Sequence, residues 1–212
     1  MMLVEEGRIN ASDPVSKFIP AFAKTAVADG SQLGSPITPA RRQVTIRDLL
    51  THSAGISYGT ERAVASLYEA AGLGPAAGFG WYTADKDEPI CVTMERLGTL
   101  PFVAQPGEKF VYGYNTDILG CVVEKASGMP LDKFVESRIT GPLGMKDSFF
   151  YRSGLDARKP TLYQRIDGAL KRVPDGAWMN GAYFSGGGGL TSTAEDYLRF
   201  ALLLANLGEL DG

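Results

Sequence analysis

The sequence predicts a chain of the α/β (α+β) class that is mainly helical and has few strands. Several segments combine apolar residues at helical spacing with capping residues at their ends, whereas only one hairpin and two short extended runs stand out. Long stretches rich in glycine, serine and proline join these segments. Either the protein is mostly helical with long loops, or its sheet lies in sequence outside this chain. Loops of that length are uncommon inside one compact domain, which counts against a complete domain.

The N-terminal part of the chain predicts short helices joined by loops. Residues 1–6 have the pattern of the last turns of a helix, and Gly7 suits its C-terminal cap. Asp13 is expected to cap a short helix that Pro20 ends. The stretch 24–44 is rich in glycine, serine and proline and is expected to be a loop. Because the chain starts with only the end of a helix, we expect it to be part of a longer domain.

Three helices are expected in the next part of the chain. Thr45 and Asp48 resemble a capping box that opens an amphipathic helix ending at Gly55. Residues 62–71 and 93–100 are two further helical segments.

The clearest helix lies near the middle of the chain. We expect Thr116 to cap it and Gly128 to close it, because the apolar residues between them recur at helical spacing, at positions 118, 119, 122, 123 and 126. Residues 130–139 predict another helix.

The C-terminal part predicts a hairpin followed by a helix. Residues 162–173 are expected to form the hairpin, with Asp167-Gly168 as a type I′ turn. Ser192 and Glu195 resemble a second capping box, which opens the last helix.

Composition excludes several classes of partner. Hydrophobic residues make up 44% of the 212 residues and charged residues 21%, which is ordinary for a globular protein. The net charge of −3 provides no basic field for nucleic acid or an anionic membrane, and we expect neither as a partner. The compartment is unknown from the sequence, and a cytoplasmic location is favoured because the chain shows no export signal.

The chain is poor in metal-binding side chains. Cys91 and Cys121 are its only cysteines and His52 its only histidine, so the sequence predicts no metal site and no cofactor. One disulfide is compatible with two cysteines. Because both have apolar neighbours, we favour two buried, inert thiols.

Gly55-Ile-Ser57-Tyr-Gly59 matches the G-x-S-x-G nucleophile elbow. That elbow needs a strand before the serine and a histidine far downstream, whereas here a helix comes first and His52 lies upstream. We therefore favour a turn that ends a helix. The pKa of an ordinary histidine would suit a general base, but for His52 we favour a structural role, with the side chain bonding the last carbonyls of its helix.

Two further features could contribute to a site. The glycines at 186–189 lack the ending of a P-loop, so we expect this backbone to pass close to another segment or to a ligand. Tyr112 lies just before a helix, where a tyrosine is usually half-buried packing. It becomes a useful base only if a nearby ammonium stabilises its phenolate.

Six blocks in order give the chain a wider resemblance. They are Met2–Ile9, Asp13–Pro20, Val44–Gly55, Pro106–Gly120, Gly141–Met145 and Gly186–Thr193. Together they resemble the serine β-lactamase-related superfamily, which contains class C β-lactamases, DD-peptidases and family VIII carboxylesterases. The resemblance implies a β-lactamase/penicillin-binding-protein-like fold, whose sheet is built from both ends of the domain and whose middle is largely helical.

Three motifs carry the chemistry of that family, and only the second is expected in this chain. The first, Ser-x-x-Lys, supplies the nucleophile and is absent from the sequence; the Thr83–Lys86 pair is no credible substitute. The third, Lys-Thr-Gly or a Trp/His-containing variant, is expected beyond the region matched by Gly212 and is absent too. We therefore expect residues 1–212 to be the central part of the domain, without the N-terminal Ser-x-x-Lys segment and the C-terminal sheet strands.

The second family motif, Tyr-x-Asn or Tyr-Ser-x, implies the site residues. It matches at Tyr112, the implied base or proton relay, although Tyr114 stands at the third position and Asn115 falls one residue late. Tyr58, Tyr114, Asn115 and Gly188 are the implied substrate-binding residues.

The resemblance also implies a function. It is that of a serine hydrolase, carboxylesterase-type, acting through an acyl-enzyme on a small-molecule ester. The alternatives are a catalytically inactive fragment or penicillin-recognising binding scaffold, and a β-lactamase or DD-peptidase with a β-lactam substrate. Self-association is a further expectation, because the helices would leave apolar faces uncovered.

Overall fold

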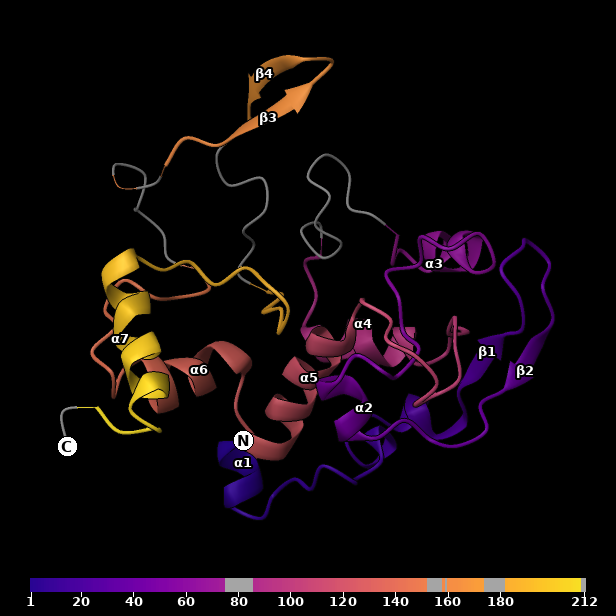
Figure 1. The fold of residues 1–212 in the computed structure, drawn as a ribbon, viewed down its shortest axis with the longest axis horizontal. Helices are drawn as coiled ribbons and strands as arrows, with labels where there is room; N and C mark the ends of the chain where they lie inside the picture. The colour runs from indigo at the N-terminus through magenta and orange to yellow at the C-terminus, as the bar shows by residue number, and fades with distance from the viewer. Residues whose placement is uncertain (75–85, 152–157, 159, 174–181, 211–212) are drawn as a thin grey trace.

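In a computed structural model of the chain, helices predominate (Figure 1). The structure describes residues 1–74, 86–151, 158, 160–173 and 182–210. The strands of this part form two separate antiparallel pairs, β1 (Ala26–Ala28) with β2 (Ile37–Pro39) and β3 (Tyr163–Ile166) with β4 (Ala169–Arg172). The predicted mainly helical chain with few strands is therefore confirmed.

Helix α5 (Asn115–Ser127) lies at the centre of the molecule. It packs against α2 (Ile46–Leu50), α4 (Ile90–Leu97), α6 (Leu131–Val135) and α1 (Met2–Glu5) (Figure 1). Its buried face carries apolar residues and also two polar ones, at positions 115, 117, 118, 120, 121 and 122. Burial of this face joins most of the helices into one hydrophobic core, and it fixes the position of the helix start.

The ends of α5 show one confirmed prediction and one error. Gly128 closes the helix in the left-handed conformation, with φ of 73°, as its lack of a side chain allows. The predicted cap at Thr116 is wrong, because the helix already begins at Asn115, after Tyr114. The predicted helix over 130–139 is confirmed as α6, which continues into the π-helical turn η3 (Glu136–Thr140).

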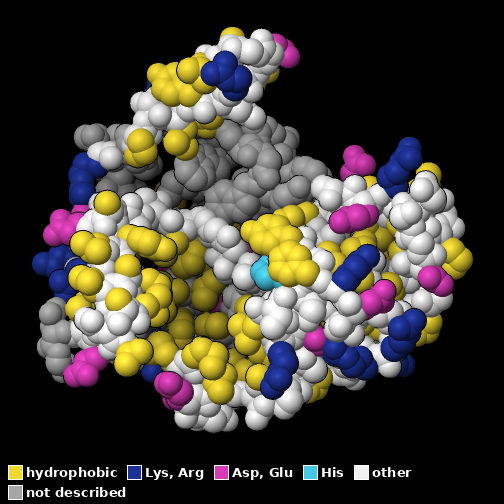
Figure 2. Space-filling view, in the orientation of Figure 1, with side chains coloured by type: hydrophobic (Ala, Val, Ile, Leu, Met, Phe, Trp, Pro, Cys, Tyr) yellow, Lys and Arg dark blue, Asp and Glu magenta, His cyan; other side chains and the backbone are white. Residues whose placement is uncertain are grey.

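The predicted hairpin is confirmed as β3 and β4, and its turn residues Asp167 and Gly168 both have positive φ, as a type I′ turn requires. Helix α7 (Ala194–Ala205) follows, but its cap is Thr193, whose side chain accepts from the Asp196 amide. The capping box predicted at Ser192 and Glu195 is therefore wrong by one residue. Figure 2 shows hydrophobic side chains gathered over α7, at the left of the view.

Several short elements differ from the sequence prediction. Part of the stretch 24–44, expected to be a loop, forms β1 and β2. The Ala28 amide also donates to the carbonyl oxygen of Phe102, which is distant in the sequence. Pro20 does not end a helix. It starts the 3₁₀ helix η2 (Pro20–Lys24), which follows η1 (Val15–Lys17). A proline in the first turn costs no backbone hydrogen bond, because an amide there has no partner within the helix. The predicted helices at 62–71 and 93–100 are present as α3 (Ala65–Ala70) and α4.

A disulfide joins the two central helices. Cys91 on α4 and Cys121 on α5 are bonded, with their Cα atoms 5.0 Å apart. The predicted pair of inert thiols is therefore wrong. Apolar neighbours indicate burial for each cysteine, but only the packing of α4 on α5 decides that the two sulfur atoms meet.

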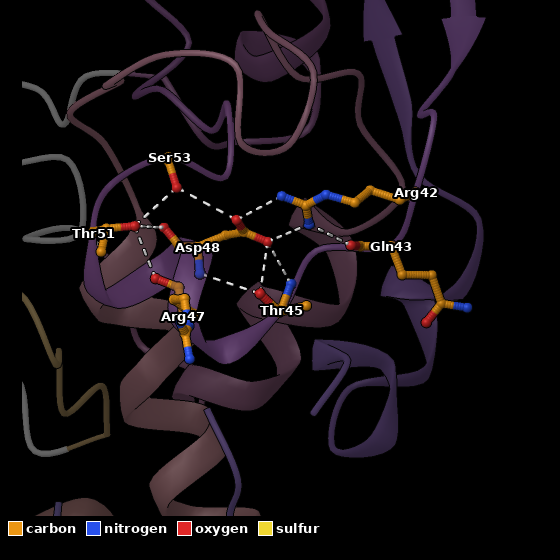
Figure 3. Close-up of polar contacts among 7 residues, drawn as sticks. All are labelled: Arg42, Gln43, Thr45, Arg47, Asp48, Thr51 and Ser53. Carbon is orange, nitrogen blue, oxygen red and sulfur yellow. Dashed lines mark hydrogen bonds and ion pairs between the residues drawn. The ribbon is translucent and has the colours of Figure 1, made fainter. Parts of the chain in front are cut away.

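A polar network fixes the start of α2 (Figure 3). The Thr45 side chain accepts from the Asp48 amide, and the Asp48 carboxylate accepts from the Thr45 amide at 2.9 Å, which confirms the predicted capping box. Arg42 donates to both oxygens of the same carboxylate. The helix ends earlier than predicted, at Leu50, and the next turn leads into the segment that carries His52.

In the described part of the chain, no helix has the length and apolarity needed to cross a membrane. Among the same residues, no group of three or more metal-ligating acidic, histidine or cysteine side chains comes together.

Candidate active site

Tyr112 stands at the surface, on the loop that leads into α5. Its side chain is 65% exposed, so the half-buried position typical of such a tyrosine is not observed. The phenol ring stacks on the imidazole of His52, with centroids 5.1 Å apart and planes 20° apart. Tyr58 meets the same phenol edge-on at 5.8 Å. Figure 2 shows hydrophobic side chains gathered around the histidine at this surface.

His52 is tied to the Tyr112 loop by its backbone and by its ring. Its carbonyl oxygen accepts from the Val111 amide at 2.7 Å, and its Nδ1 lies 3.1 Å from Nδ2 of Asn115. The residue has φ of 53°, a left-handed conformation that is uncommon outside glycine. We expected the ring to bond the last helix carbonyls; instead it turns toward Asn115 and Tyr112.

Asn115 is fully buried beneath this loop. Its Nδ2 faces the carbonyl oxygens of Val111 and Ile56 at 3.2 and 3.4 Å, besides His52. Its Oδ1 has no hydrogen-bond partner among the described residues. The resemblance implies a substrate-binding Asn115, and in this structure the side chain contacts the loop rather than the surface.

Tyr114 is also fully buried, and its hydroxyl donates to the Leu73 carbonyl oxygen at 2.6 Å. Tyr58 lies between the two motif tyrosines, edge-on to the Tyr114 ring at 4.9 Å. Gly113 allows this packing, because a Cβ atom there would lie 2.4 Å from the Ile56 carbonyl oxygen. Tyr58 and Tyr112 are thus brought together at the surface, whereas Tyr114 supports them from the core.

The glycine run lies against the start of α5. A Cβ atom at position 186 would lie 2.1 Å from the Thr116 carbonyl oxygen, and one at 187 would lie 2.9 Å from the Thr116 hydroxyl. The expectation that this backbone passes close to another segment is confirmed. Gly188, an implied substrate-binding residue, is half-buried and directly follows these two glycines.

Asp117 is a buried carboxyl that the sequence did not single out. Its Oδ1 accepts from the hydroxyls of Ser185 and Tyr183, and Ser185 in turn accepts from the Gly187 amide at 2.9 Å. The start of α5 is thereby bonded to the glycine run. An acidic residue in a first helical turn is commonplace, because it suits the helix dipole. The signal that was missed is its position on the apolar face, one turn before Cys121.

Burial dominates the electrostatics of Asp117. It raises the pKa of this carboxyl to about 6, although the hydrogen bonds from Ser185 and Tyr183 favour the charged form. Burial also raises the pKa of Tyr183 above its ordinary value, so that its hydroxyl keeps its proton and donates.

Ser57 has the environment of a turn residue. It is buried, and its hydroxyl donates to Glu61 at 2.5 Å and accepts from the Gly59 amide at 3.0 Å. This geometry supports the turn interpretation of the Gly55–Gly59 segment. Thr83, the threonine of the Thr-x-x-Lys pair, lies outside the described residues.

A cavity of about 900 Å³ opens beside Tyr112. Its wall includes the aromatic residues Phe110 and Tyr112 and the charged residues Asp29, Arg41 and Glu61. Such a cavity is large enough for a small organic molecule, and both aromatic and charged side chains line it.

The sequence model of the Beta-lactamase family matches residues 1–212. The chain belongs to the β-lactamase family. Esterase EstB of Burkholderia gladioli is 32% identical over 217 residues, which cover 94% of this chain and 51% of EstB. Lovastatin esterase of Penicillium rubens is 34% identical over 222 residues, which cover 99% of this chain and 52% of the esterase.

A solved structure shows the same fold. EstCE1, described as a hydrolase with promiscuous acyltransferase activity, superposes with a TM-score of 0.76 at 25% identity, over 99% of this chain and 55% of EstCE1. The chain therefore has the β-lactamase/penicillin-binding-protein-like fold that its motifs implied. It spans about half the length of the curated relatives it matches.

Within this β-lactamase-family fold, the described residues bring together the surface aromatics Tyr58, Tyr112 and His52 and the cavity beside them. Asp117 bonds the glycine run to the same helix start. The sequence contains no Ser-x-x-Lys, so no serine of this chain has the lysine spacing of the family's nucleophile.

Proposed function

We propose that a protein carrying this chain is a serine hydrolase that cleaves small-molecule carboxylic esters through an acyl-enzyme. The observation that carries the proposal is the exposed Tyr112, stacked on His52 at the edge of a cavity of about 900 Å³. The nucleophilic serine and its lysine would come from a segment outside residues 1–212. A small-molecule ester is then the partner, with no role for nucleic acid.

In this reaction Tyr112 transfers the proton. As the serine oxygen attacks the ester carbonyl, the phenolate of Tyr112 accepts the serine proton and passes it to the leaving alcohol. Water then attacks the acyl-enzyme, releases the acid and restores the serine. A lysine ammonium next to Tyr112 would favour the phenolate that starts this sequence.

Two relatives that are described as esterases support ester cleavage. Esterase EstB and lovastatin esterase cover nearly the whole chain at more than 30% identity. The β-lactamase or DD-peptidase alternative has less support, because the third motif position holds Tyr114, which is buried, where those enzymes carry a polar side chain. The inactive fragment or binding scaffold stays the alternative for the 212 residues by themselves.

Acyl transfer to an alcohol is a second candidate, and the description of EstCE1 favours it. The same acyl-enzyme would then be attacked by an alcohol instead of water. Product analysis separates the two, because transfer yields a new ester when an alcohol is added, whereas hydrolysis yields only the acid.

The test replaces Tyr112 with phenylalanine in a protein that joins this chain to its Ser-x-x-Lys segment. Phenylalanine keeps the ring but removes the hydroxyl, so kcat for p-nitrophenyl butyrate should fall about a hundredfold to ten-thousandfold, with little change in Tm. Tyr114→Phe is the matched control: it should lower Tm, because the buried Leu73 carbonyl loses its donor, but should lower kcat far less. Equal kcat values for Tyr112→Phe and the parent would refute the proposal.

Assays on the 212-residue chain test the missing nucleophile. We expect it to cleave neither p-nitrophenyl esters nor nitrocefin. Turnover that Ser57→Ala abolishes would instead restore the nucleophile-elbow interpretation. In the joined protein, turnover of nitrocefin in preference to the ester would favour the β-lactamase alternative.

A further inference from the structure

We propose that His52 is a positioning residue for Tyr112, whose imidazole sets the orientation of the phenol for proton transfer. The proposal rests on the proposed function, because it concerns how the Tyr112 hydroxyl is aimed at the reacting atoms. It assigns a role in the reaction to a histidine that sequence reasoning placed in helix termination.

Tyr112 needs an external constraint. Its side chain is 65% exposed, and no hydrogen bond joins its hydroxyl to any residue in the described ranges. A phenol that is free to turn about two side-chain torsions presents its oxygen in many directions. Proton transfer, in contrast, needs the oxygen within hydrogen-bond reach of its partner. Within the described residues, the ring of Tyr112 contacts His52 through the stack and Tyr58 through its edge.

The stack supplies that constraint, because it covers a face of the ring. With planes only 20° apart and centroids at 5.1 Å, the imidazole lies flat along the phenol. Rotation of Tyr112 about its first torsion would lift the ring off His52. The edge contact with Tyr58, at 73°, touches only the rim of the phenol ring and leaves its tilt less constrained.

His52 can act as a support because it is itself held at three points. Its backbone amide donates to Leu49, its carbonyl accepts from Val111, and its ring bonds to Asn115. Asn115 is fully buried and is fixed in turn by the Val111 carbonyl. The imidazole is thereby fixed relative to the backbone that carries Tyr112.

The same contacts assign the imidazole tautomer. Nδ2 of Asn115 faces two backbone carbonyl oxygens, which only an NH₂ group can satisfy, so the amide orientation is determined by its neighbours. An NH₂ group does not accept hydrogen bonds, so Nδ1 of His52 can act only as the acceptor in its contact with Asn115, and the ring carries its proton on Nε2. A ring held in one tautomer by a buried amide keeps one orientation.

The backbone conformation of His52 supports a role for the ring beyond ending α2. At φ of 53°, glycine would fit with less strain, and asparagine fits as well as histidine. Helix termination therefore does not require an imidazole. The strained conformation points the one histidine of the chain at Tyr112, as expected where strain serves a site.

A double-mutant cycle tests the proposal in the protein that carries the Ser-x-x-Lys segment. His52→Asn keeps the backbone conformation and removes the stacked ring. We expect kcat for p-nitrophenyl butyrate to fall about tenfold to a hundredfold, with KM nearly unchanged, as for a misplaced catalytic group. In the Tyr112→Phe background the same change should have no further effect, because the hydroxyl that His52 positions is gone.

The outcomes separate this proposal from the one it rests on. If His52→Asn lowers kcat by the same factor in both backgrounds, the residue acts independently of the hydroxyl and the inference is overturned. If Tyr112→Phe alone leaves kcat unchanged, the proposed function fails first.

His52→Gly gives a second measurement that does not depend on the fate of the asparagine variant. Glycine suits the positive φ and leaves a space beside Tyr112 that added imidazole can enter. We expect added imidazole to restore part of the lost kcat of His52→Gly, but none in the double variant with Tyr112→Phe. Full activity of His52→Gly without imidazole would overturn the inference.

Discussion

Arg42 donates hydrogen bonds from both terminal nitrogens to the Asp48 carboxylate, at 2.6 and 2.8 Å, and the same carboxylate completes the cap of α2. Burial alone would raise the pKa of Asp48, but the hydrogen bonds from Arg42 and Thr45 outweigh it, and the pKa lies below its ordinary value. The stability that this arrangement contributes is present above pH 3.8 and is lost as the pH falls further.

Asp48→Asn should therefore destabilise the protein at neutral pH. It removes a charged acceptor from a buried network, and we expect the free energy of unfolding to fall by about 1–3 kcal/mol. Urea denaturation at pH 7 measures this loss. The difference from the parent should shrink below pH 3.8, where the parent carboxylate also takes up a proton. Asp13→Asn, which breaks an exposed pair with Lys17, is the control and should change little.

Asp117→Asn should have the opposite pH dependence. Because the folded pKa of Asp117 is raised from 3.8 to about 6, its contribution to stability is full below pH 3.8 and is lost as the pH rises past 6. Asparagine keeps the acceptor for Ser185 and Tyr183 without a buried charge. The variant should match the parent near pH 4 and exceed it at pH 8 by up to about 3 kcal/mol. A difference that does not vary with pH would show that Asp117 does not titrate in this range.

Reduction of the disulfide should destabilise the helical core. Cys91 and Cys121 are 30 residues apart, and closing a loop of that length stabilises a fold by about 3–4 kcal/mol in the chain-entropy account. Dithiothreitol should lower Tm, and it should have no effect on the variant with alanine at both positions. Disulfides persist mainly in oxidising compartments, so this bridge disfavours the predicted cytoplasmic location. Alkylation of thiols in freshly lysed cells checks which state is present.

The exposed apolar residues of α7 should make the 212-residue chain self-associate. They are Tyr197, Leu198, Leu202 and Leu204, each at least 42% exposed. Contiguous apolar surface of this kind drives association. Leu198→Glu should shift the species seen by light scattering toward the monomer. Leu33→Glu, which changes a leucine that is 76% exposed on the loop between β1 and β2, should not.

Sequence patterns predicted those features of the fold whose contacts join residues only a few positions apart. The Thr45–Asp48 capping box, the Asp167-Gly168 turn and the Gly128 cap each depend on contacts inside one turn of the chain. The caps predicted at Thr116 and Ser192 are local errors in register, whereas two other errors depend on distant partners. The disulfide joins residues 30 apart, and β1 is completed by Phe102, so no local pattern could show either.

The site divides in the same way. Family resemblance, and not local physics, drew attention to Tyr112, since a tyrosine before a helix is usually packed and this one is exposed. Asp117 was missed because its partners, Ser185 and Tyr183, lie more than sixty residues away. His52 was assigned to its own helix because its true partner, Asn115, is equally remote in sequence.

The backbone contacts of Gly113 and Gly186 determine where directed evolution could act on this protein. A side chain at either position would have to displace main-chain atoms of Ile56 or Thr116, so both positions are closed to substitution. Phe110, which is 68% exposed on the cavity wall, carries no such constraint. A mutant library for new substrates should therefore vary the aromatic rim and leave the two glycines unchanged.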